Sequence, residues 1–440
     1  MSFKAVTRLE VRLEHGPGDD EVVGRLAIER RQSFFEYDPA FIAAGRSISP
    51  LRLPLRSGLQ AGPDGHLRGL HGVFDDSLPD GWGLLLMDRT FQARGIRTAE
   101  LSPLDRLAYL GRRTLGALTY HPCSESDAPS YEALDLATLA TASRAIFEGR
   151  TTDVLPALRR AGGSPGGARP KVLIGVRDDR IISGADRLPP DFHPWLLKFA
   201  TRSELPNTGP LEYAYARMAR AAGITMPEVR LFGPLPDGER CFAVRLFDRD
   251  GNARSHVHTL ANLMHADYRT PNLDYEHLLR VALKLTGSHA QVRECFRRAV
   301  FNLLSHNRDD HGKNFAFIMA RDGSWTASPA YDLTFVEGPG GEHTMTFRGE
   351  GRRPTWAHLQ QLADLVSLDA AEALEILEQV REGVGSFASE ATRLQLPAAQ
   401  IREIAERLAR TADAAALPAP RRPKPRASPA RKTSPRKRAS

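Results

Sequence analysis

The chain has 440 residues, of which 60 are lysine or arginine and 53 aspartate or glutamate, and its formal net charge is +7. This length predicts two or three domains, and an apolar content of 41% with a charged content of 26% is typical of a globular protein. The three cysteines are scattered and form no CxxC pair, which argues against disulfides and a zinc site. The sequence has no run of 18 apolar residues and no signal-peptide core, which argues against a membrane span and export. We therefore expect a cytoplasmic protein.

The first 120 or so residues carry the pattern of half-buried strands. Polar and apolar residues alternate from Arg8 to Leu13, and residues 22–29 behave similarly. Turns rich in glycine and proline follow, and a helix is predicted at residues 82–94. We therefore expect a β-rich N-terminal part.

The middle of the chain alternates between helix and strand signals. Residues 124–130 are rich in Ser, Asp and Pro and predict a linker, and a helix is expected at residues 130–149. From Gly162 the pattern indicates a strand, a loop, a strand and then a helix at residues 210–222, which begins with proline and stops before a glycine.

After a strand-like segment at residues 231–249 the pattern becomes mainly helical. An apolar stripe follows the spacing i, i+3, i+4, i+7, i+8 and i+11, formed by Val292, Cys295, Phe296, Ala299, Val300 and Leu303. Further helices are predicted at residues 356–366, 369–385 and 397–414. A mixed lobe followed by a helical lobe predicts an α+β protein of the bilobal, protein-kinase-like fold.

Residues 307–314 read Asn-Arg-Asp-Asp-His-Gly-Lys-Asn, which places Asp309 and Asn314 at the spacing of a kinase catalytic loop. An aspartate there can reach the hydroxyl being phosphorylated, while the asparagine holds Mg²⁺ on the phosphates. Taken alone, the octapeptide is more typical of a polar turn after a helix. Three further elements, in the order that a phosphotransferase needs, favour the catalytic interpretation.

The first element is the glycine-rich segment at residues 162–171, which leads into an apolar strand. Glycines let the backbone approach phosphate oxygens, and Lys171 adds a positive charge. The segment is neither a Walker A loop nor GxGxxG, and on its own a turn between strands is the commoner explanation.

The second element is Lys198, which stands in the apolar stretch Pro-Trp-Leu-Leu-Lys-Phe-Ala. A lysine is costly to bury there unless it meets an anion, as an ATP-orienting lysine does. The alternative is an edge-strand lysine whose head reaches water. Glu212, on the next helix, is the candidate ion-pair partner, although any exposed helix glutamate would look the same.

The third element is Asp332, in Asp-Leu-Thr rather than Asp-Phe-Gly, which follows a strand at residues 315–319. A second metal ligand is needed at this place. The ordered series of glycine-rich loop, lysine, glutamate, catalytic loop and aspartate indicates nucleotide-dependent phosphotransfer.

These residues are similar to those of the HipA-like serine/threonine kinases, the toxin halves of bacterial toxin–antitoxin pairs. The resemblance runs from about residue 5 to about residue 410, and its most specific pieces are residues 166–171, 247–249, 307–314 and 329–332, supported by residues 77–83 and 116–119. Aminoglycoside-type kinases share the catalytic loop but are not expected to carry this N-terminal half. The resemblance implies an N-terminal subdomain at residues 1–123, the remainder of the N-lobe at 124–249, a helical C-lobe at 250–415 and a tail at 416–440.

The resemblance also implies roles for individual residues. Asp309 would be the catalytic base, Asn314 and Asp332 would hold Mg²⁺ between the β- and γ-phosphates, and Lys198, paired with Glu212, would contact the phosphates of ATP. The remaining ATP-binding positions would be Gly166, Gly167 and Lys171 in the phosphate loop, Arg245, Leu246 and Phe247 at the adenine-contacting hinge, His311 and Lys313, which would shape the catalytic loop, and Tyr331.

Ser164 falls where family members autophosphorylate, an event that throws the loop out and silences the enzyme. The chain departs from the family at Pro165, where a small or aliphatic residue is more usual and where proline would stiffen the loop against ejection. It departs again at Arg169, where glutamine is frequent. Neither change removes a catalytic group, so we expect an active kinase.

The family's partners supply two hypotheses. In the first, the chain phosphorylates a translation component, typically an aminoacyl-tRNA synthetase, and is restrained by a small helix-turn-helix antitoxin that binds operator DNA. In the second, it is an antitoxin-bound, nucleotide-dependent corepressor on DNA with little catalysis. The intact set of catalytic residues favours the first.

The basic character of the chain lies in its tail. Nine of the 60 basic residues and none of the 53 acidic ones fall at residues 416–440, so the rest of the chain has 51 basic and 53 acidic residues. The tail lacks aliphatic and aromatic residues after Leu417, which predicts disorder. Its charge suits non-specific contact with nucleic acid, and a solubilising extension is the alternative.

Overall fold

A computed structural model describes residues 5–30, 32–124, 133–161, 166–184, 187–201 and 207–419 of the chain. Ser164 and Pro165 lie outside the described residues, as do tail residues 420–440 and most of the predicted linker. In the described part, no helix has the length and apolar character needed to cross a bilayer.

The N-terminal domain is built on a five-stranded antiparallel sheet in the order β4-β3-β2-β1-β5, with alternate residues such as Leu9, Val11 and Leu13 fully buried. The strands are β1 (Arg8–Gly16), β2 (Asp19–Glu29), β3 (Gln32–Tyr37), β4 (Gln60–Ala61) and β5 (Leu118–His121). The two strands predicted from alternation are confirmed, and the helix predicted at residues 82–94 is α3 (Gly81–Ala93). The expectation of a β-rich first third is only partly right, because it missed the helical segments α1 (Pro39–Ala43), α2 (Gly72–Asp75), η1 (Thr98–Glu100) and α4 (Pro103–Leu110).

A second five-stranded antiparallel sheet, in the order β7-β6-β8-β10-β9, forms the middle of the molecule. Its strands are β6 (Lys171–Arg177), β7 (Arg180–Ser183), β8 (His193–Lys198), β9 (Val229–Phe232) and β10 (Cys241–Arg245). One face packs against α3, α5 (Leu136–Phe147) and α6 (Pro156–Ala161), and Trp82 of α3 is only 1% exposed in that core. The other face packs against α7 (Thr208–Ala221). Helices α5 and α7 lie where the sequence predicted helices, although α5 starts later.

The C-terminal part is mainly helical, as predicted, and the six residues of the apolar stripe are buried on α10. Its helical segments are α8 (Leu260–Met264), α9 (Tyr275–Thr286), α10 (His289–Leu304), η2 (Gly312–Asn314), η3 (Pro339–Gly341), α11 (Trp356–Leu365), α12 (Ala370–Gly385), α13 (Phe387–Arg393) and α14 (Ala398–Ala414). Its two short two-stranded sheets pair β11 (Arg249–Asp250) with β12 (Ala253–Arg254) and β14 (Leu273–Asp274) with β17 (Met345–Thr346). A three-stranded sheet has the order β13 (His256–Thr259), β15 (Ala316–Met319) and β16 (Trp325–Ala327).

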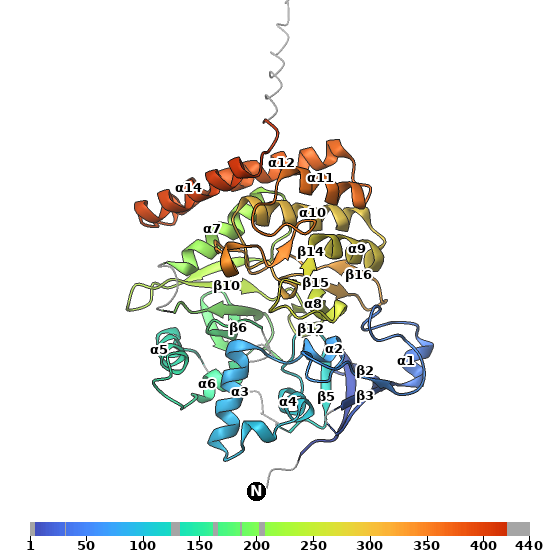
Figure 1. The fold of residues 1–440 in the computed structure, drawn as a ribbon. Coiled ribbons are helices and arrows are strands. Elements are labelled where there is room, and N and C mark those ends of the chain that lie inside the picture. Colours follow the sequence, from blue (N-terminus) through green and yellow to red (C-terminus); the bar gives the residue numbers. More distant parts are fainter. Residues whose placement is uncertain are drawn as a thin grey trace, which may run out of the picture.

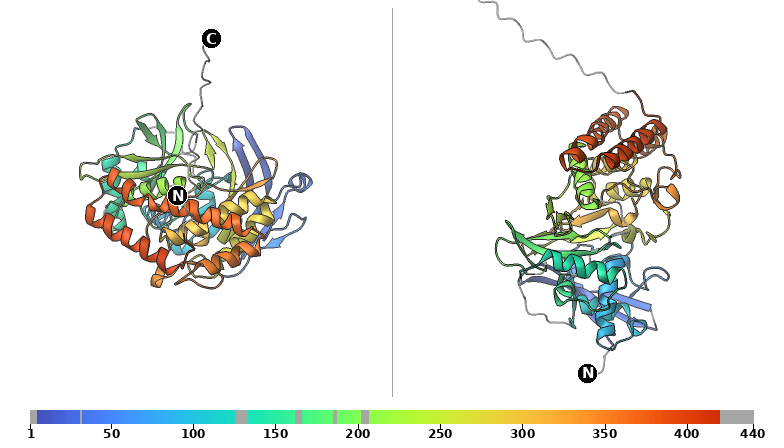
Figure 2. Two further views of the ribbon diagram at one scale, coloured as in Figure 1. Left: turned by 90° about the horizontal axis from the view of Figure 1, so that it is seen from above. Right: turned by 90° about the vertical axis from the view of Figure 1, so that its left-hand side faces the viewer.

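The three parts are layered along the molecule. In Figure 1 the helices α11, α12 and α14 lie at the top, the sheet with β6 and β10 in the middle, and the N-terminal sheet and α4 at the bottom. The right-hand view in Figure 2 shows the same order from the side. The loop between α10 and β15, which holds the predicted catalytic residues, joins the helical part to the short sheet of β13, β15 and β16.

Candidate active site

The loop between α10 and β15 is fixed by a buried aspartate, Asp310, which is 0% exposed. Its carboxylate accepts hydrogen bonds from the Tyr275 hydroxyl at 2.7 Å, His343 Nδ1 at 2.8 Å and the Thr344 amide at 2.8 Å. Asp309, the preceding residue, is exposed. The two neighbouring aspartates therefore have different roles, because Asp310 anchors the loop while Asp309 faces outward.

Asn314 closes the same loop. Its Nδ2 donates a hydrogen bond to the Asp309 carbonyl at 2.7 Å, so its side-chain oxygen is the atom that remains for a cation. Asp332, the second predicted metal ligand, adopts a φ of +58°. This left-handed conformation is uncommon for residues other than glycine and is concentrated at functional sites.

Two buried lysines face each other at the end of the central sheet. Lys171 on β6 is the direct register partner of Lys198 on β8, and the two residues are 5% and 7% exposed. Like charges directly opposite each other destabilise a sheet unless anions lie between them. Lys198 Nζ lies 2.8 Å from Glu212 Oε2 and also contacts Asp332 Oδ1. The structure thus brings together the predicted lysine, its glutamate partner and the predicted metal ligand.

These contacts shift the pKa values of the two lysines and of Asp332. Burial lowers the pKa of Lys171 to about 8, although Asp332 partly opposes this effect. Burial would also lower the pKa of Lys198, but Asp332 and Glu212 outweigh it and raise that pKa. Desolvation would raise the pKa of Asp332, yet the charges of Lys198 and Lys171 hold it well below its usual range. Clustered shifts of this kind are typical of functional sites.

The pKa of Asp309, the predicted catalytic base, shifts in the opposite direction to that of Asp332. Although the Asp309 residue is exposed, desolvation of its carboxyl group raises its pKa. His311 opposes this rise, while the negative charges of Asp332 and Asp310 add to it. A raised pKa makes a carboxylate a better proton acceptor near neutral pH.

Arg169, noted in the sequence only as a departure from the family, belongs to the same network. Its Nη1 contacts Glu212 Oε1, so Glu212 holds Arg169 with one oxygen and Lys198 with the other. Glu212 itself is 2% exposed. The network therefore ties the end of the glycine-rich loop to α7.

The aromatic residues predicted at the ATP site lie side by side. The rings of Phe247 and Tyr331 stack with centroids 5.4 Å apart, and the Tyr331 hydroxyl donates to the Lys313 carbonyl at 2.7 Å. The other two hinge residues are engaged in local contacts. Leu246 donates its amide to the Pro194 carbonyl at 2.9 Å, and Arg245 lies 3.2 Å from Asp250.

The remaining predicted positions make contacts that the sequence did not suggest. Lys313 lies 3.4 Å from Asp80 and 4.6 Å from the centre of the Tyr268 ring, which also contacts the His311 ring. The Gly167 amide donates to Asp80, and the Gly166 carbonyl accepts from Lys171 Nζ. Asp80 therefore joins the site from the N-terminal domain.

Comparison with known families identifies this architecture. A family model described as the HipA-like C-terminal domain matches residues 163–416, and the HipA N-terminal domain matches residues 18–121. The chain belongs to the HipA family. The resemblance predicted from the sequence is confirmed.

Relatives of this HipA-family chain carry kinase names. It is 28% identical over 313 residues to a protein of Sinorhizobium fredii named "Putative kinase Y4dM", covering 66% of this chain and 70% of that one. It is 27% identical over 191 residues to a protein of Haemophilus influenzae named "Putative kinase", covering 40% and 54% of the two chains.

Among solved structures, a Shewanella oneidensis complex of the toxin–antitoxin system HipA, HipB and its operator DNA contains a similar chain. The TM-score is 0.68 at 16% identity, with 92% of this chain and 96% of the other covered. At this identity the likeness shows the fold. The predicted α+β, protein-kinase-like fold class is confirmed.

The site fits Mg²⁺ in its donor chemistry. Mg²⁺ prefers oxygen ligands and commonly takes one or two protein groups together with substrate phosphates. Asp332 supplies a carboxylate and Asn314 an amide oxygen. No group of three or more His, Cys, Asp or Glu residues that could hold a metal occurs in the part of the chain that the structure describes.

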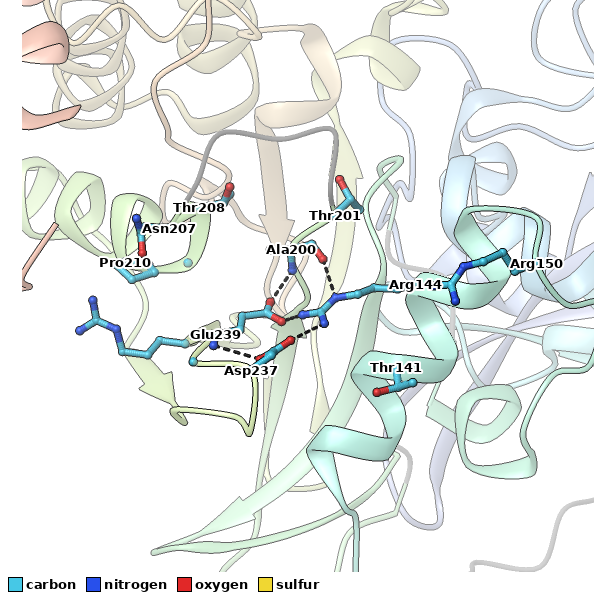
Figure 3. A pocket seen from close by; sticks show the side chains of 13 residues that line it. Thr141, Arg144, Arg150, Ala200, Thr201, Asn207, Thr208, Pro210, Asp237 and Glu239 are labelled. Carbon is cyan, nitrogen blue, oxygen red and sulfur yellow. Dashed lines mark hydrogen bonds and ion pairs between the residues drawn. The ribbon is translucent and has the colours of Figure 1, made fainter. Parts of the chain in front are cut away.

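A pocket of about 570 Å³ lies apart from this HipA-family site, between α5, the start of α7 and the turn before β10. Figure 3 shows Arg144 crossing it toward the Ala200 carbonyl, Asp237 and Glu239. None of the predicted ATP-site residues lines it. The Arg144 contacts tie α5 to the end of β8 and to the β9–β10 turn.

Proposed function

We propose that the chain is an ATP- and Mg²⁺-dependent serine/threonine protein kinase of the HipA toxin type. The observation that carries this proposal is the buried lysine pair, Lys171 and Lys198, held beside Asp332. Beside Glu212 and Asp332, two facing lysines can take a further anion, and the phosphates of ATP suit two lysines and a metal-binding carboxylate. The kinase names of the relatives support the same activity.

In this proposal the residues divide the work of phosphate transfer. Lys171 and Lys198 would attract the phosphates, and Phe247, with Tyr331 stacked beside it, would contact the adenine. Asp309 orients the acceptor hydroxyl and accepts its proton, a role that its raised pKa favours. Mg²⁺, held by Asn314 and Asp332, would neutralise charge on the phosphates.

The proposed substrate and partners are taken from the family resemblance. We propose that the chain autophosphorylates at Ser164 and acts on a translation component such as an aminoacyl-tRNA synthetase, in the cytoplasm. The similar Shewanella oneidensis chain is described in a complex with HipB and operator DNA. This supports a helix-turn-helix antitoxin as a partner of the present chain.

Mass spectrometry after incubation with ATP and Mg²⁺ tests the kinase directly. We expect one phosphate on Ser164 of the parent protein and none on Asp309→Gln, because the amide cannot accept the proton. Phosphate on both proteins would contradict the role of Asp309. ATP binding without any phosphate would favour the alternative of a nucleotide-dependent corepressor.

ATP binding should weaken as pH rises through about 8. Lys171 has its pKa lowered to about 8, so it is charged below this pH and neutral above it. Between pH 7 and pH 9 the charged fraction falls about tenfold, and the affinity for ATP should fall by a similar factor. Titration calorimetry measures this dependence. Lys171→Arg keeps its charge and should bind ATP almost equally at both pH values. If the affinity of this variant for ATP falls with pH as steeply as that of the parent, Lys171 is not the cause of the pH dependence.

The tail is proposed to contact nucleic acid through its nine basic residues. A chain ending at Ala415 should lose salt-sensitive binding to DNA of arbitrary sequence and keep its kinase activity. Electrophoretic mobility shift at two salt concentrations measures the difference. An unchanged binding curve would leave the tail as a solubilising extension.

A further inference from the structure

The N-terminal domain reaches the nucleotide site through Asp80, the residue before α3. Asp80 is 6% exposed, and its two carboxylate oxygens contact different parts of the kinase-like fold. Oδ1 accepts the Gly167 amide, and Oδ2 lies 3.4 Å from Lys313 Nζ. One carboxylate therefore bridges the glycine-rich loop and the catalytic loop.

The contact between α3 and the glycine-rich loop is reciprocal. Asp80 occupies the N-cap of α3, where an aspartate usually accepts an amide of its own helix, but it makes no such bond. The amide of Trp82 in the first turn donates instead to the Gly167 carbonyl at 3.1 Å. The Trp82 indole donates to the Lys171 carbonyl at 2.9 Å. The loop thus provides the acceptor for an amide in the first turn of α3, and the N-cap residue of α3 provides the acceptor for an amide of the loop.

The backbone at the start of α3 lies so close to the backbone of the glycine-rich loop that no side chain fits between them. A Cβ added to Gly81 would lie 2.6 Å from the Gly167 carbonyl oxygen and 2.7 Å from Ala168 Cα, and Gly81 has a φ of +42°. Only glycine fits at this position. Burial would raise the pKa of Asp80, but Lys313 and the Gly167 amide outweigh it, so the carboxylate stays charged.

We propose that Asp80 is a positioning residue of the nucleotide site, an inference that rests on the proposed kinase function. It holds the glycine-rich loop against α3, which fixes Lys171 opposite Lys198, and it fixes Lys313 of the catalytic loop through the same carboxylate. The N-terminal domain is then part of the ATP site rather than a separate module. Its contribution is to binding ATP and not to the chemical step.

The full-length chain with Asp80→Ala, Asp80→Asn and a control variant tests this. Asp88→Asn is the control, since Asp88 lies on the same helix, is 28% exposed and pairs only with Arg106 among the described contacts. Asp80→Ala should raise KM for ATP about tenfold while kcat changes less than about threefold. Asp80→Asn should lie between Asp80→Ala and the parent protein, because its amide oxygen still accepts the Gly167 amide while the charge facing Lys313 is lost. Asp88→Asn should match the parent.

Hydrogen exchange of a peptide that includes Gly166 to Lys171 gives a readout without activity. This peptide should exchange faster in Asp80→Ala than in the parent, while peptides from β1 and β2 exchange as in the parent. Parent-like KM and exchange in Asp80→Ala would overturn the inference while leaving the kinase intact. If the parent does not bind ATP, the proposed function fails, and the exchange rates still decide whether Asp80 holds the loop.

Discussion

Replacing Asp332 by asparagine should reduce phosphate transfer by about a thousandfold or more. The carboxylate is the counter-ion of Lys198, and its pKa is held well below the usual range by Lys198 and Lys171 after desolvation is overcome. Asparagine keeps the size of the side chain and tolerates the left-handed φ of +58° at this position. The loss would therefore report the missing charge and metal ligand rather than a strained backbone.

The rate of Ser164 phosphorylation, followed by peptide mass spectrometry, measures this effect. Asp322→Asn is a suitable control, because Asp322 is exposed in the turn between β15 and β16 and accepts hydrogen bonds from Ser324. It should keep the parent rate. A rate for Asp332→Asn above about a tenth of the parent rate would remove Asp332 from the proposed mechanism.

The elements of the site that the sequence predicted are those whose signals are local. Asp309 and Asn314 lie five residues apart on one loop, and Lys198 interrupts an apolar strand, so each is visible without the fold. Glu212 could be placed only by its order after Lys198. The fold then brings it within 2.8 Å of that lysine.

The contributions of Asp310 and Asp80 could not be predicted in this way, because their partners are distant in sequence. Asp310 meets Tyr275, 35 residues away, and Asp80 meets Gly167, 87 residues away. Both aspartates stand in segments that the sequence had singled out. Only the packing of the three parts shows that one anchors the catalytic loop and that the other bridges two loops.

The missed helices of the N-terminal domain have a different cause. Helices α1 and α2 have five and four residues, too few for a helical period to show. Helix α4 carried a readable signal, since Ser102 and Asp105 form a capping box around Pro103 at the first turn. The prediction of a β-rich N-terminal part had extended the strand pattern of β1 and β2 too far along the chain.

The interface between the N-terminal domain and the C-lobe depends on another buried carboxylate, that of Asp76. It accepts His258 Nδ1 at 2.6 Å, the Thr259 amide at 2.8 Å, the Thr259 hydroxyl at 2.7 Å and Asn262 Nδ2 at 2.8 Å. On the far side of the His258 ring, Nε2 lies 3.0 Å from the Ser49 hydroxyl. Two segments of the N-terminal domain thereby hold β13 and α8, which precede and support the catalytic loop.

Asp76→Ala should lower the free energy of unfolding by about 3–5 kcal/mol, because it leaves four buried donors without their acceptor. Urea denaturation followed by tryptophan fluorescence measures the change, read from the midpoint of the first transition. Asp88→Ala is the matched control, since its ion pair with Arg106 is 28% exposed on the aspartate side and should contribute about 1 kcal/mol at most. Equal midpoints for the two variants would mean that the N-terminal domain is held by its apolar contacts and not by Asp76.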